Sequence, residues 1–325
     1  MNEWLGKTVL VTGGTGLLGS HLVRVLSDQG ATAISVSRKP MGEEICVAAR
    51  SGVIKSFQID LLDRLEVLAL CTSIEPPIDV LIHCAALDGN AAFKIRHPAE
   101  IVTNNVQLAS NVLEAARSSA IPDVVLVSSA EIYSSAAQNP IRESDDFTTI
   151  FPFPSNGYVR SKVIIEILGQ VYAEQYGLRI YSPRPTNLYG PGDISGTERG
   201  RVIPAMLERI LSGGVVEIWG DGRQSRSFMY AEDAAKAILL MVQKRLVGPL
   251  NMATSETITI EDLATSLFEL TSRPKQISFK GRMPIGERDR LLNIESLSEM
   301  LDFEPWSLEE GLRETIHWHM RSRVI

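Results

Sequence analysis

KTVLVTGGTGLLG, residues 7–19, is the stretch of sequence that decides the expected fold. Its first part, Thr8–Thr12, is a short run rich in Val and Leu, which is typical of a buried strand. Gly13, Gly16 and Gly19 follow, and beyond them apolar residues recur at helical spacing. The stretch therefore predicts a strand, a glycine turn and a helix in direct succession.

The order of strand, turn and helix gives the glycines a chemical meaning. One glycine of such a turn permits the bend, one lets the backbone approach a pyrophosphate, and one lets helix and strand pack closely. The helix N-terminus adds free N–H groups and a positive dipole end. Chance would give roughly 0.13 such triplets in a chain with 24 glycines, so the position of the triplet carries the signal. We expect a dinucleotide site with contacts from Gly13, Thr15, Gly16, Leu17 and Gly19; the alternative is a turn that holds no nucleotide.

Outward from this unit, strand-like and helix-like segments alternate. TNNVQLASNVLEAARSSA (103–120) and YVRSKVIIEILGQVYAEQYG (158–177) are the longest helix-like segments. The pattern predicts an α/β protein with a Rossmann-type, doubly wound parallel sheet and helices on both of its faces. Five further apolar segments read as strands of this sheet: AISVSR (33–38), VIKSFQID (53–60), DVLIHCAA (79–86), VVLVSS (124–129) and LRIYSPR (178–184).

The alternation loosens after about residue 183. RPTNLYGPGDISGTERG (184–200) is rich in Gly and Pro, which is typical of a long functional loop. We expect an NAD(P)-binding domain over residues 1–182. A smaller C-terminal substrate lobe, partly interleaved with it, is expected over 183–325.

Composition excludes several classes of function. A net charge of −7 argues against non-specific binding to nucleic acid. No signal peptide and no apolar run long enough to span a bilayer are present, so we expect no membrane partner and a cytoplasmic location. The histidines lack zinc-like spacing, and Cys46, Cys71 and Cys84 form no C-x-x-C pair, so we expect reduced thiols and no metal site.

The end of the second predicted strand indicates which cofactor binds. NAD-binding proteins place an acidic residue there for the ribose 2′-hydroxyl, whereas NADP-binding proteins place an arginine nearby. Ser37 and Arg38 stand at this position without an acid, so NADP(H) is favoured and NAD(H) is the alternative. An arginine that is merely solvated at a strand end is the competing interpretation. Asp60 and Leu61, at the end of the third strand, are placed to meet the adenine ring.

Tyr158 and Lys162 are the candidate catalytic pair. Their i, i+4 spacing at the start of a helix puts both side chains on one face. A phenol ordinarily titrates near pH 10, and a neighbouring ammonium stabilises its phenolate. Ser129, at the end of the VVLVSS strand, can hydrogen-bond the same substrate oxygen. A lone Y-x-x-x-K has roughly one chance in three of arising in such a chain, so the order of the motifs carries this prediction.

In that order the motifs resemble the extended short-chain dehydrogenase/reductase superfamily, also called the NAD-dependent epimerase/dehydratase family, in its nucleotide-sugar branch. TGGTGLLGSHL resembles the cofactor turn of the family, LIHCAA its fourth strand, SSAEIYS its catalytic serine segment and YVRSK its Tyr/Lys helix. PTNLYGP followed by VIPA and a Trp-Gly turn is most similar to GDP-L-fucose synthase-like reductases. The resemblance covers essentially the whole chain.

The resemblance implies roles for individual residues. It identifies Ser129, Tyr158 and Lys162 as the catalytic trio, with Tyr158 and Lys162 also holding the cofactor. Ala85, Ala86 and Pro185 are implied as further cofactor contacts. The implied nucleotide-sugar contacts are Asn187 and Arg226 at the phosphates, Trp219 near the base, Arg288 or Arg290 near the diphosphate, and Val202 and Glu131.

Two positions depart from the fucose synthase pattern. Those enzymes carry a Cys two residues after the serine and a His before the V-I-P segment, whereas this chain has Glu131 and Arg201. The expected reaction is therefore NADPH-dependent reduction of a 4-keto nucleotide sugar. The alternative is a nucleotide-sugar 4-epimerase that uses bound NAD(P). Minor alternatives are a nucleotide-sugar decarboxylase and a non-catalytic NADP-binding protein.

A homodimer is expected from the two longest helix-like segments. The segment that begins at Tyr158 has more apolar residues than one buried face needs: Val163, Ile164, Ile167, Leu168 and Val171. The resemblance points to its pairing with the 106–118 helix of each subunit in a four-helix bundle.

Overall fold

Seven parallel strands form the central sheet of the computed structural model, which describes residues 3–41, 52–150, 156–193, 201–281 and 290–322. The strand order is β11-β6-β5-β4-β1-β2-β3, and every neighbouring pair is parallel. The predicted doubly wound α/β fold is confirmed. The strands are β1 (Thr8–Thr12), β2 (Thr32–Ser37), β3 (Val53–Gln58), β4 (Val80–His83), β5 (Asp123–Leu126), β6 (Arg179–Pro185) and β11 (Gly248–Met252).

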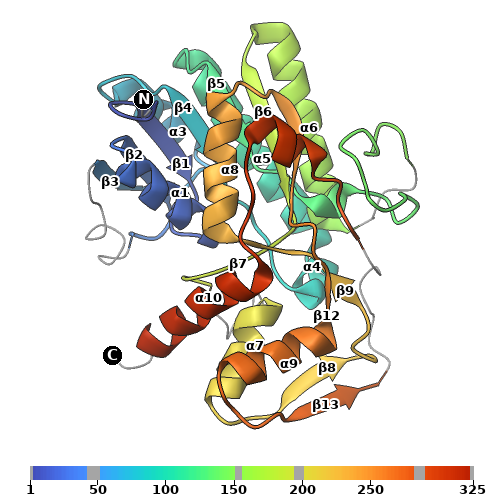
Figure 1. Ribbon diagram of the computed structural model, residues 1–325. Coiled ribbons are helices and arrows are strands. Elements are labelled where there is room, and N and C mark those ends of the chain that lie inside the picture. Colours follow the sequence, from blue (N-terminus) through green and yellow to red (C-terminus); the bar gives the residue numbers. More distant parts are fainter. Residues whose placement is uncertain (1–2, 42–51, 151–155, 194–200, 282–289, 323–325) are drawn as a thin grey trace.

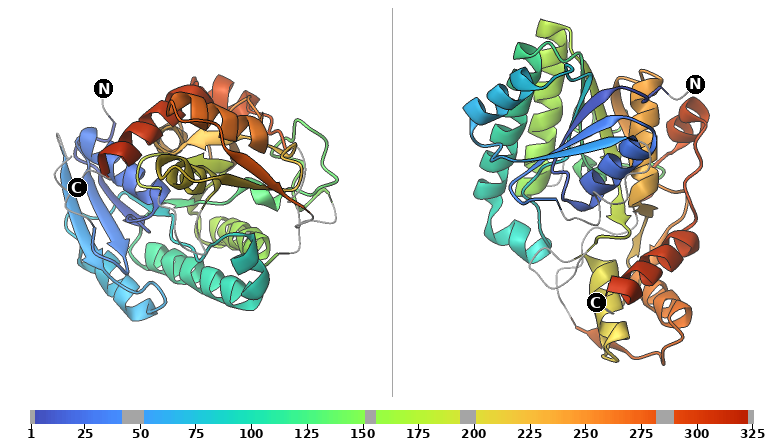
Figure 2. Two further views of the ribbon diagram at one scale, coloured as in Figure 1. Left: turned by 90° about the horizontal axis from the view of Figure 1, so that it is seen from below. Right: turned by 90° about the vertical axis from the view of Figure 1, so that its left-hand side faces the viewer.

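Helices cover both faces of the sheet (Figure 1 and Figure 2). A hydrophobic core lies on each face of the sheet, because successive side chains of a strand point to opposite faces. Val9 and Val11 of β1 belong to one buried cluster, and Leu10 belongs to the other. The first cluster includes side chains of α1 (Leu17–Asp28) and α8 (Ala231–Gln243). The second includes α3 (Arg64–Ser73), α5 (Pro98–Ser118) and α6 (Gly157–Tyr176).

A second lobe lies at one end of the sheet (Figure 1). Its own apolar cluster joins three helices to short strands. The helices are α7 (Val202–Leu211), α9 (Ile260–Leu270) and α10 (Leu308–Ser322), and the paired strands are β7 (Asn187–Tyr189) with β10 (Phe228–Tyr230), β8 (Val216–Trp219) with β13 (Ile277–Lys280), and β9 (Ser225–Arg226) with β12 (Ile258–Thr259).

The chain passes between the sheet layer and the lobe more than once. Helix α8 packs on α1, and β11 pairs with β6, although both follow β7–β9 of the lobe in sequence. We keep the division into 1–182 and 183–325 as a proposal in which α8 and β11 are the interleaved part. The short elements α4 (Ala91–Arg96), η1 (Ala130–Ile132) and η2 (Ser296–Met300) complete the described structure.

The glycine turn is held by close backbone packing. Gly13 has φ +71°, and a Cβ on it would lie 2.8 Å from the Ala85 backbone nitrogen. A Cβ on Gly19 would lie 2.2 Å from the Gly13 carbonyl oxygen. Strand, turn and helix therefore approach as closely as the sequence predicts, and β1 sits beside β4 where the strand order reverses.

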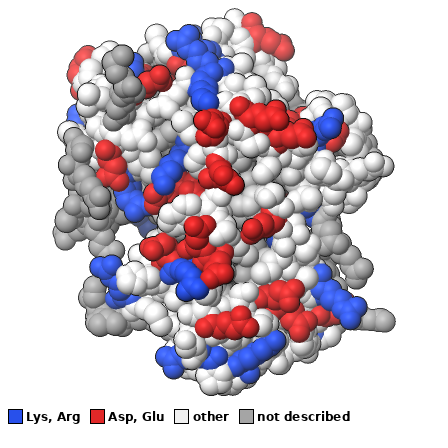
Figure 3. All heavy atoms as spheres, in the orientation of Figure 1, with Lys and Arg blue, Asp and Glu red and all other residues white. Residues whose placement is uncertain are grey.

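Helix hydropathy, clusters of possible metal ligands and surface charge are the features of the described residues that bear on membrane, metal and nucleic-acid binding. No helix among them is long and apolar enough to cross a membrane. No metal-binding group of His, Cys, Asp and Glu occurs within them. On the face seen in Figure 3, acidic and basic side chains are intermixed over the described surface rather than gathered into one basic area. Cys71 and Cys84 are free thiols, and Cys46 lies outside the described residues.

Candidate active site

Tyr158 and Lys162 lie in the first two turns of α6. The helix begins at Gly157, where the Asn156 side chain accepts a hydrogen bond from Val159 N at 2.9 Å. A Cβ on Gly157 would lie 2.4 Å from the Pro98 carbonyl oxygen, so glycine lets α6 start against α5. The Lys162 Nζ atom lies 5.6 Å from the Tyr158 ring centroid and donates to the Val127 carbonyl at 2.6 Å.

Ser129 joins this pair from the end of β5. It is buried, its side chain accepts from Glu131 N at 3.1 Å, and it forms a side-chain hydrogen bond with Tyr158. The structure therefore brings the three predicted catalytic residues together.

Electrostatics at the pair differ from those of a lone tyrosine and lysine. Burial, and then the carboxylates of Asp88 and Glu131, raise the pKa of Tyr158 well above its usual value. The Ser129 hydrogen bond and the Arg201 charge oppose this rise. Burial lowers the pKa of Lys162 to about 8, so its amine stays mainly protonated at pH 7.

Three charged groups beside Tyr158 were not predicted as partners of Glu131 or of the phenol. Lys94 of α4 lies 4.2 Å from the Tyr158 ring centroid, 2.7 Å from Glu131 Oε1 and 3.3 Å from Asp88 Oδ1. Arg201, which was noted only as a departure, pairs with Asp193 at 2.7 Å. Lys94 and Asp88 belong to no recognisable motif, and only the fold places them here.

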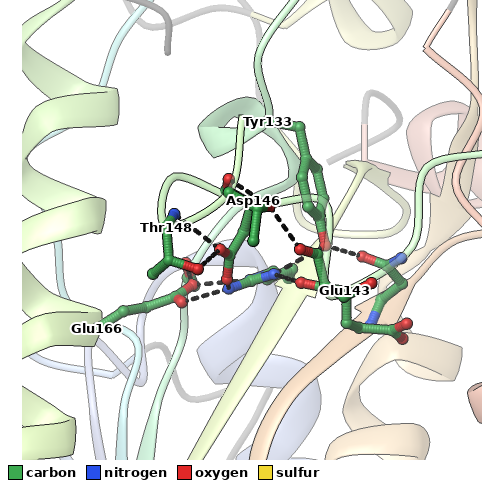
Figure 4. Close-up of polar contacts among 10 residues, drawn as sticks. Tyr133, Glu143, Asp146, Thr148 and Glu166 are labelled. Carbon is green, nitrogen blue, oxygen red and sulfur yellow. Dashed lines mark hydrogen bonds and ion pairs between the residues drawn. The ribbon is translucent and has the colours of Figure 1, made fainter. Parts of the chain in front are cut away.

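A buried polar network holds α6 one turn beyond Lys162, through Glu166 (Figure 4). Arg184 is 0% exposed, and its guanidinium pairs with Glu166 of α6 at 2.6 Å and with Asp146 at 2.8 Å. It also donates to the Tyr133 hydroxyl at 3.0 Å, and Ser128 donates to Glu166. The residues that flank Ser129 in the chain are thereby tied to the helix that carries Tyr158.

The predicted cofactor residues gather at the carboxyl ends of the parallel strands. Gly13 N donates to the Val36 carbonyl at 2.7 Å, which joins the glycine turn to the end of β2. There Ser37 is buried and Arg38 is exposed. Gly16, Gly19 and Leu17 open α1 next to exposed Thr15; Asp60 and Leu61 follow β3, Ala85 and Ala86 follow β4, and Pro185 ends β6.

The predicted substrate residues are spread more widely. Exposed Asn187 of β7 donates to the Ser227 carbonyl at 2.9 Å, which puts it beside the residue that follows Arg226. Arg226 lines a cavity of about 720 Å³ with Thr254, Glu256 and residues of α9 and α10. Exposed Trp219 ends β8, and half-buried Val202 begins α7.

Of the two candidate diphosphate arginines, Arg288 lies outside the described residues. Arg290 donates to the carbonyls of Ala130 at 2.9 Å and Tyr133 at 3.2 Å. It therefore braces the η1 segment that carries Glu131.

Comparison with known proteins decides the family. A sequence model of the NAD dependent epimerase/dehydratase family matches residues 9–253. The chain belongs to this family. The predicted membership is confirmed, and with it the expected class of NAD(P)-dependent nucleotide-sugar oxidoreductase or epimerase.

Several members resemble the chain over nearly its full length. Two proteins named dTDP-4-dehydro-6-deoxy-D-allose reductase are similar, from a Streptomyces species (39% identical, 98% of each chain) and from Streptomyces bikiniensis (38% identical, 98% of this chain and 97% of the relative). GDP-L-fucose synthase 1 of Arabidopsis thaliana is 26% identical over 97% of this chain and 93% of its own. A UDP-glucose 4-epimerase structure from Thermotoga maritima superposes with a TM-score of 0.87 at 27% identity, covering 97% of this chain and 99% of that one.

Proposed function

We propose that this protein reduces the 4-keto group of a 6-deoxyhexose carried on a nucleoside diphosphate, with NADPH as reductant. The observation that carries the proposal is the full-length similarity to two 4-dehydro-6-deoxy-D-allose reductases, at 39 and 38% identity. The meeting of Ser129, Tyr158 and Lys162 supports it, because beyond the hydride donor a carbonyl reduction requires only one proton donor, here with an ammonium beside it.

The residues divide the proton chemistry between them. NADPH, when bound along the glycine turn, supplies the hydride that reaches C4. Tyr158 gives its phenolic proton to the O4 oxygen as the C–H bond forms, and Ser129 holds that oxygen toward the phenol. The Lys162 ammonium stabilises the phenolate that remains and can hold the cofactor ribose. The products are then a 4-hydroxy sugar, NADP⁺ and the Tyr158 phenolate, which regains its proton from water.

The cofactor turn fits a dinucleotide. Cβ atoms at Gly13 and Gly19 would clash with neighbouring backbone, so these glycines permit the close packing of strand, turn and helix that a pyrophosphate-binding turn uses. We propose NADP(H) rather than NAD(H), since exposed Arg38 follows β2 and its neighbours in the sequence, Ser37 and Lys39, are not acidic. Charge-assisted hydrogen bonds from an arginine to a 2′-phosphate are each worth about 1.5–3 kcal/mol.

The nucleotide sugar is proposed to lie between the trio and the second lobe. Asn187 and Arg226 are proposed at its phosphates, where an arginine suits a group with about two negative charges. Trp219 and Val202 are proposed at the base, and Glu131 at the sugar. A homodimer is proposed through α6, and the cytoplasmic location stays a prediction.

A 4-epimerase is the second candidate. The similarity to the Thermotoga maritima 4-epimerase favours it, and the same trio can serve both reactions. An epimerase returns its hydride to the sugar, so its cofactor is used only catalytically.

Mixing purified protein with NADPH and 4-keto nucleotide sugars separates the candidates. We expect one NADPH to be oxidised for each 4-keto sugar that is reduced. Loss of the absorbance of reduced nicotinamide measures the cofactor, and mass spectrometry measures the sugar. Conversion of a 4-hydroxy nucleotide sugar to its C4 epimer without net change in NADPH would refute the reductase and establish the epimerase. Release of carbon dioxide from a nucleotide uronic acid would refute both.

A further inference from the structure

Lys94 stands where three elements meet over Tyr158. It lies in α4, and its side chain is 13% exposed. Its ammonium donates to both Glu131 oxygens, at 2.7 and 3.0 Å, and lies 4.2 Å from the Tyr158 ring centroid. Asp88, from the segment between β4 and α4, approaches the same ammonium at 3.3 Å. A single cation is thus shared by two carboxylates and a phenol ring.

The Lys94 charge persists in this position. Burial works against it, but Glu131 and then Asp88 outweigh burial and raise the pKa of Lys94. A cation close to the face of an aromatic ring is attracted by the ring quadrupole, by up to about 2 kcal/mol when desolvated. Its position also places a positive charge over the ring of the phenol that must give up a proton.

The charged groups around Tyr158 come from several different parts of the chain. Asp88 follows β4, Lys94 is on α4, Glu131 is on η1, Arg201 precedes α7 and Lys162 is on α6 itself. Burial, Asp88 and Glu131 raise the pKa of Tyr158, and therefore work against a phenol that must release its proton. Relatives with a neutral side chain at position 131 would not carry the second of these carboxylates.

We propose that Lys94 is a positioning residue for Tyr158: its ammonium binds Glu131 and covers the phenol ring, so that a carboxylate can stand at position 131 without weakening the proton donor. The proposal rests on the proposed function for the role of Tyr158 as donor. It also gives Glu131 a defined partner, because both of its carboxylate oxygens accept hydrogen bonds from the Lys94 ammonium. Glu131 then accepts hydrogen bonds from sugar hydroxyls rather than moving a proton.

Titration of Tyr158 tests the proposal without any substrate. Full-length protein saturated with NADP⁺ is labelled with ¹³Cζ-tyrosine, and the Tyr158 resonance is assigned by its absence in Tyr158→Phe. Lys94→Met should displace the Tyr158 titration to higher pH, since a neighbouring cation is lost. Glu131→Gln should displace it to lower pH, and the double variant should titrate close to the unaltered protein.

Two controls separate charge from packing. Lys94→Arg keeps the cation and should restore the unaltered titration. Lys236→Met removes a surface ion pair of the same chemistry, with Glu232 at 2.9 Å, and should leave the Tyr158 titration in place. If Lys94→Met fails to fold, the downward displacement in Glu131→Gln and in Asp88→Asn still tests the charge cluster. An unchanged or lowered Tyr158 titration in Lys94→Met, or an unchanged one in Glu131→Gln, overturns the proposal.

Kinetics supply the second readout. Lys94→Met should lower kcat by about tenfold, with a smaller change in KM. The alkaline limb of its pH profile of kcat should lie at higher pH than that of the unaltered protein. Glu131→Gln should mainly raise KM or change sugar preference, with at most about a tenfold loss of kcat. A protein that shows the expected titrations but reduces no 4-keto sugar would refute the proposed function and leave this inference standing. A protein that reduces 4-keto sugars but whose Tyr158 titration is unchanged in Lys94→Met would support the proposed function and refute this inference.

Discussion

At the scale of single residues, the site is a balance of charges around one phenol. Lys162 and Lys94 approach the ring of Tyr158 from α6 and α4, while Asp88 and Glu131 bring opposing charge. Lys162 is the more deeply buried cation, and its main hydrogen bond is to a backbone carbonyl. We therefore expect the removal of Lys162 and the removal of Lys94 to have different effects on the protein.

Tyr158→Phe should abolish turnover while leaving cofactor affinity nearly unchanged, because only the proton donor is lost. A placed proton donor contributes about 10²–10⁴-fold to rate, so the loss of kcat should fall in that range or beyond. Lys162→Ala should reduce both turnover and cofactor binding. Steady-state kinetics and fluorescence titration with NADPH measure the two effects. Tyr172→Phe, in the same helix but bonded to Glu114, is the matched control, and full activity in Tyr158→Phe would contradict the assignment.

Arg38→Ala should weaken NADPH binding by about tenfold to a hundredfold and NADH binding much less. The reason is that only NADPH carries the 2′-phosphate that the guanidinium can bind with charge-assisted bonds. Calorimetric titration of each cofactor gives the comparison within one variant. Arg64→Ala, an exposed arginine on α3, serves as the control. Equal losses for both cofactors would remove the basis for choosing NADP.

At the scale of elements, α6 serves the site with one face and faces solvent with another. Tyr158 and Lys162 face the site, Glu166 faces the Arg184 network, and Ile167 and Val171 are 42 and 46% exposed. The expected dimer surface needs correction, because Val163 is buried against the η1 segment and Leu168 packs in the sheet core. The exposed apolar surface is therefore smaller than the sequence predicts.

Ile167→Glu combined with Val171→Glu should convert a homodimer into a monomer, since each charge would be buried in the α6 contact. Light scattering at micromolar concentration measures the mass. Leu65→Glu, at an exposed apolar position of α3, should leave the dimer intact. A monomeric unaltered protein would show that these two residues have another role.

The local sequence pattern was sufficient to predict β1 to β6, because each strand is a short apolar run between polar turns. It was also sufficient to predict the long helices between these strands. It was not sufficient for β11, since Gly248–Met252 contains Gly, Pro and Asn and gains its place only by pairing with β6. The meeting of Ser129, Tyr158 and Lys162 was predictable because they keep fixed positions relative to strand and helix ends. Lys94 was not, because a single lysine in a six-residue helix has no signal until the chain folds α4 over α6.

At the scale of the whole molecule, two buried histidines link stability to pH. Burial, with help from Arg24, lowers the pKa of His21 to about 4, and burial, with help from Lys162, lowers that of His83 to about 3. The unfolded chain takes up these protons as pH falls through about 6.5, whereas the folded protein does not. Their contribution to stability is therefore lost progressively below about pH 6.5.

Each histidine should add about 1.4 kcal/mol per pH unit to the fall in the free energy of unfolding, between about pH 6.5 and its pKa in the folded protein. Urea unfolding at a series of pH values measures the slope. His21→Asn and His83→Asn should each flatten it, whatever they do to stability at pH 7. His317→Asn, at an exposed position of α10, should not. Parallel slopes for all variants would contradict the assignment.

The Arg184 network has a consequence for how the molecule opens. One guanidinium holds α6 through Glu166 and the 143–146 segment through Asp146 and the Glu143 carbonyl, while Tyr133 extends the network to β11 through Asn251. Removing one partner of a buried ion pair costs about 3–5 kcal/mol of stability. Detaching any one of these segments by itself would therefore be unfavourable. Their backbone amides should exchange with solvent as one cooperative unit. Helix α6, with Tyr158 and Lys162, then keeps its geometry through any local opening that spares Arg184.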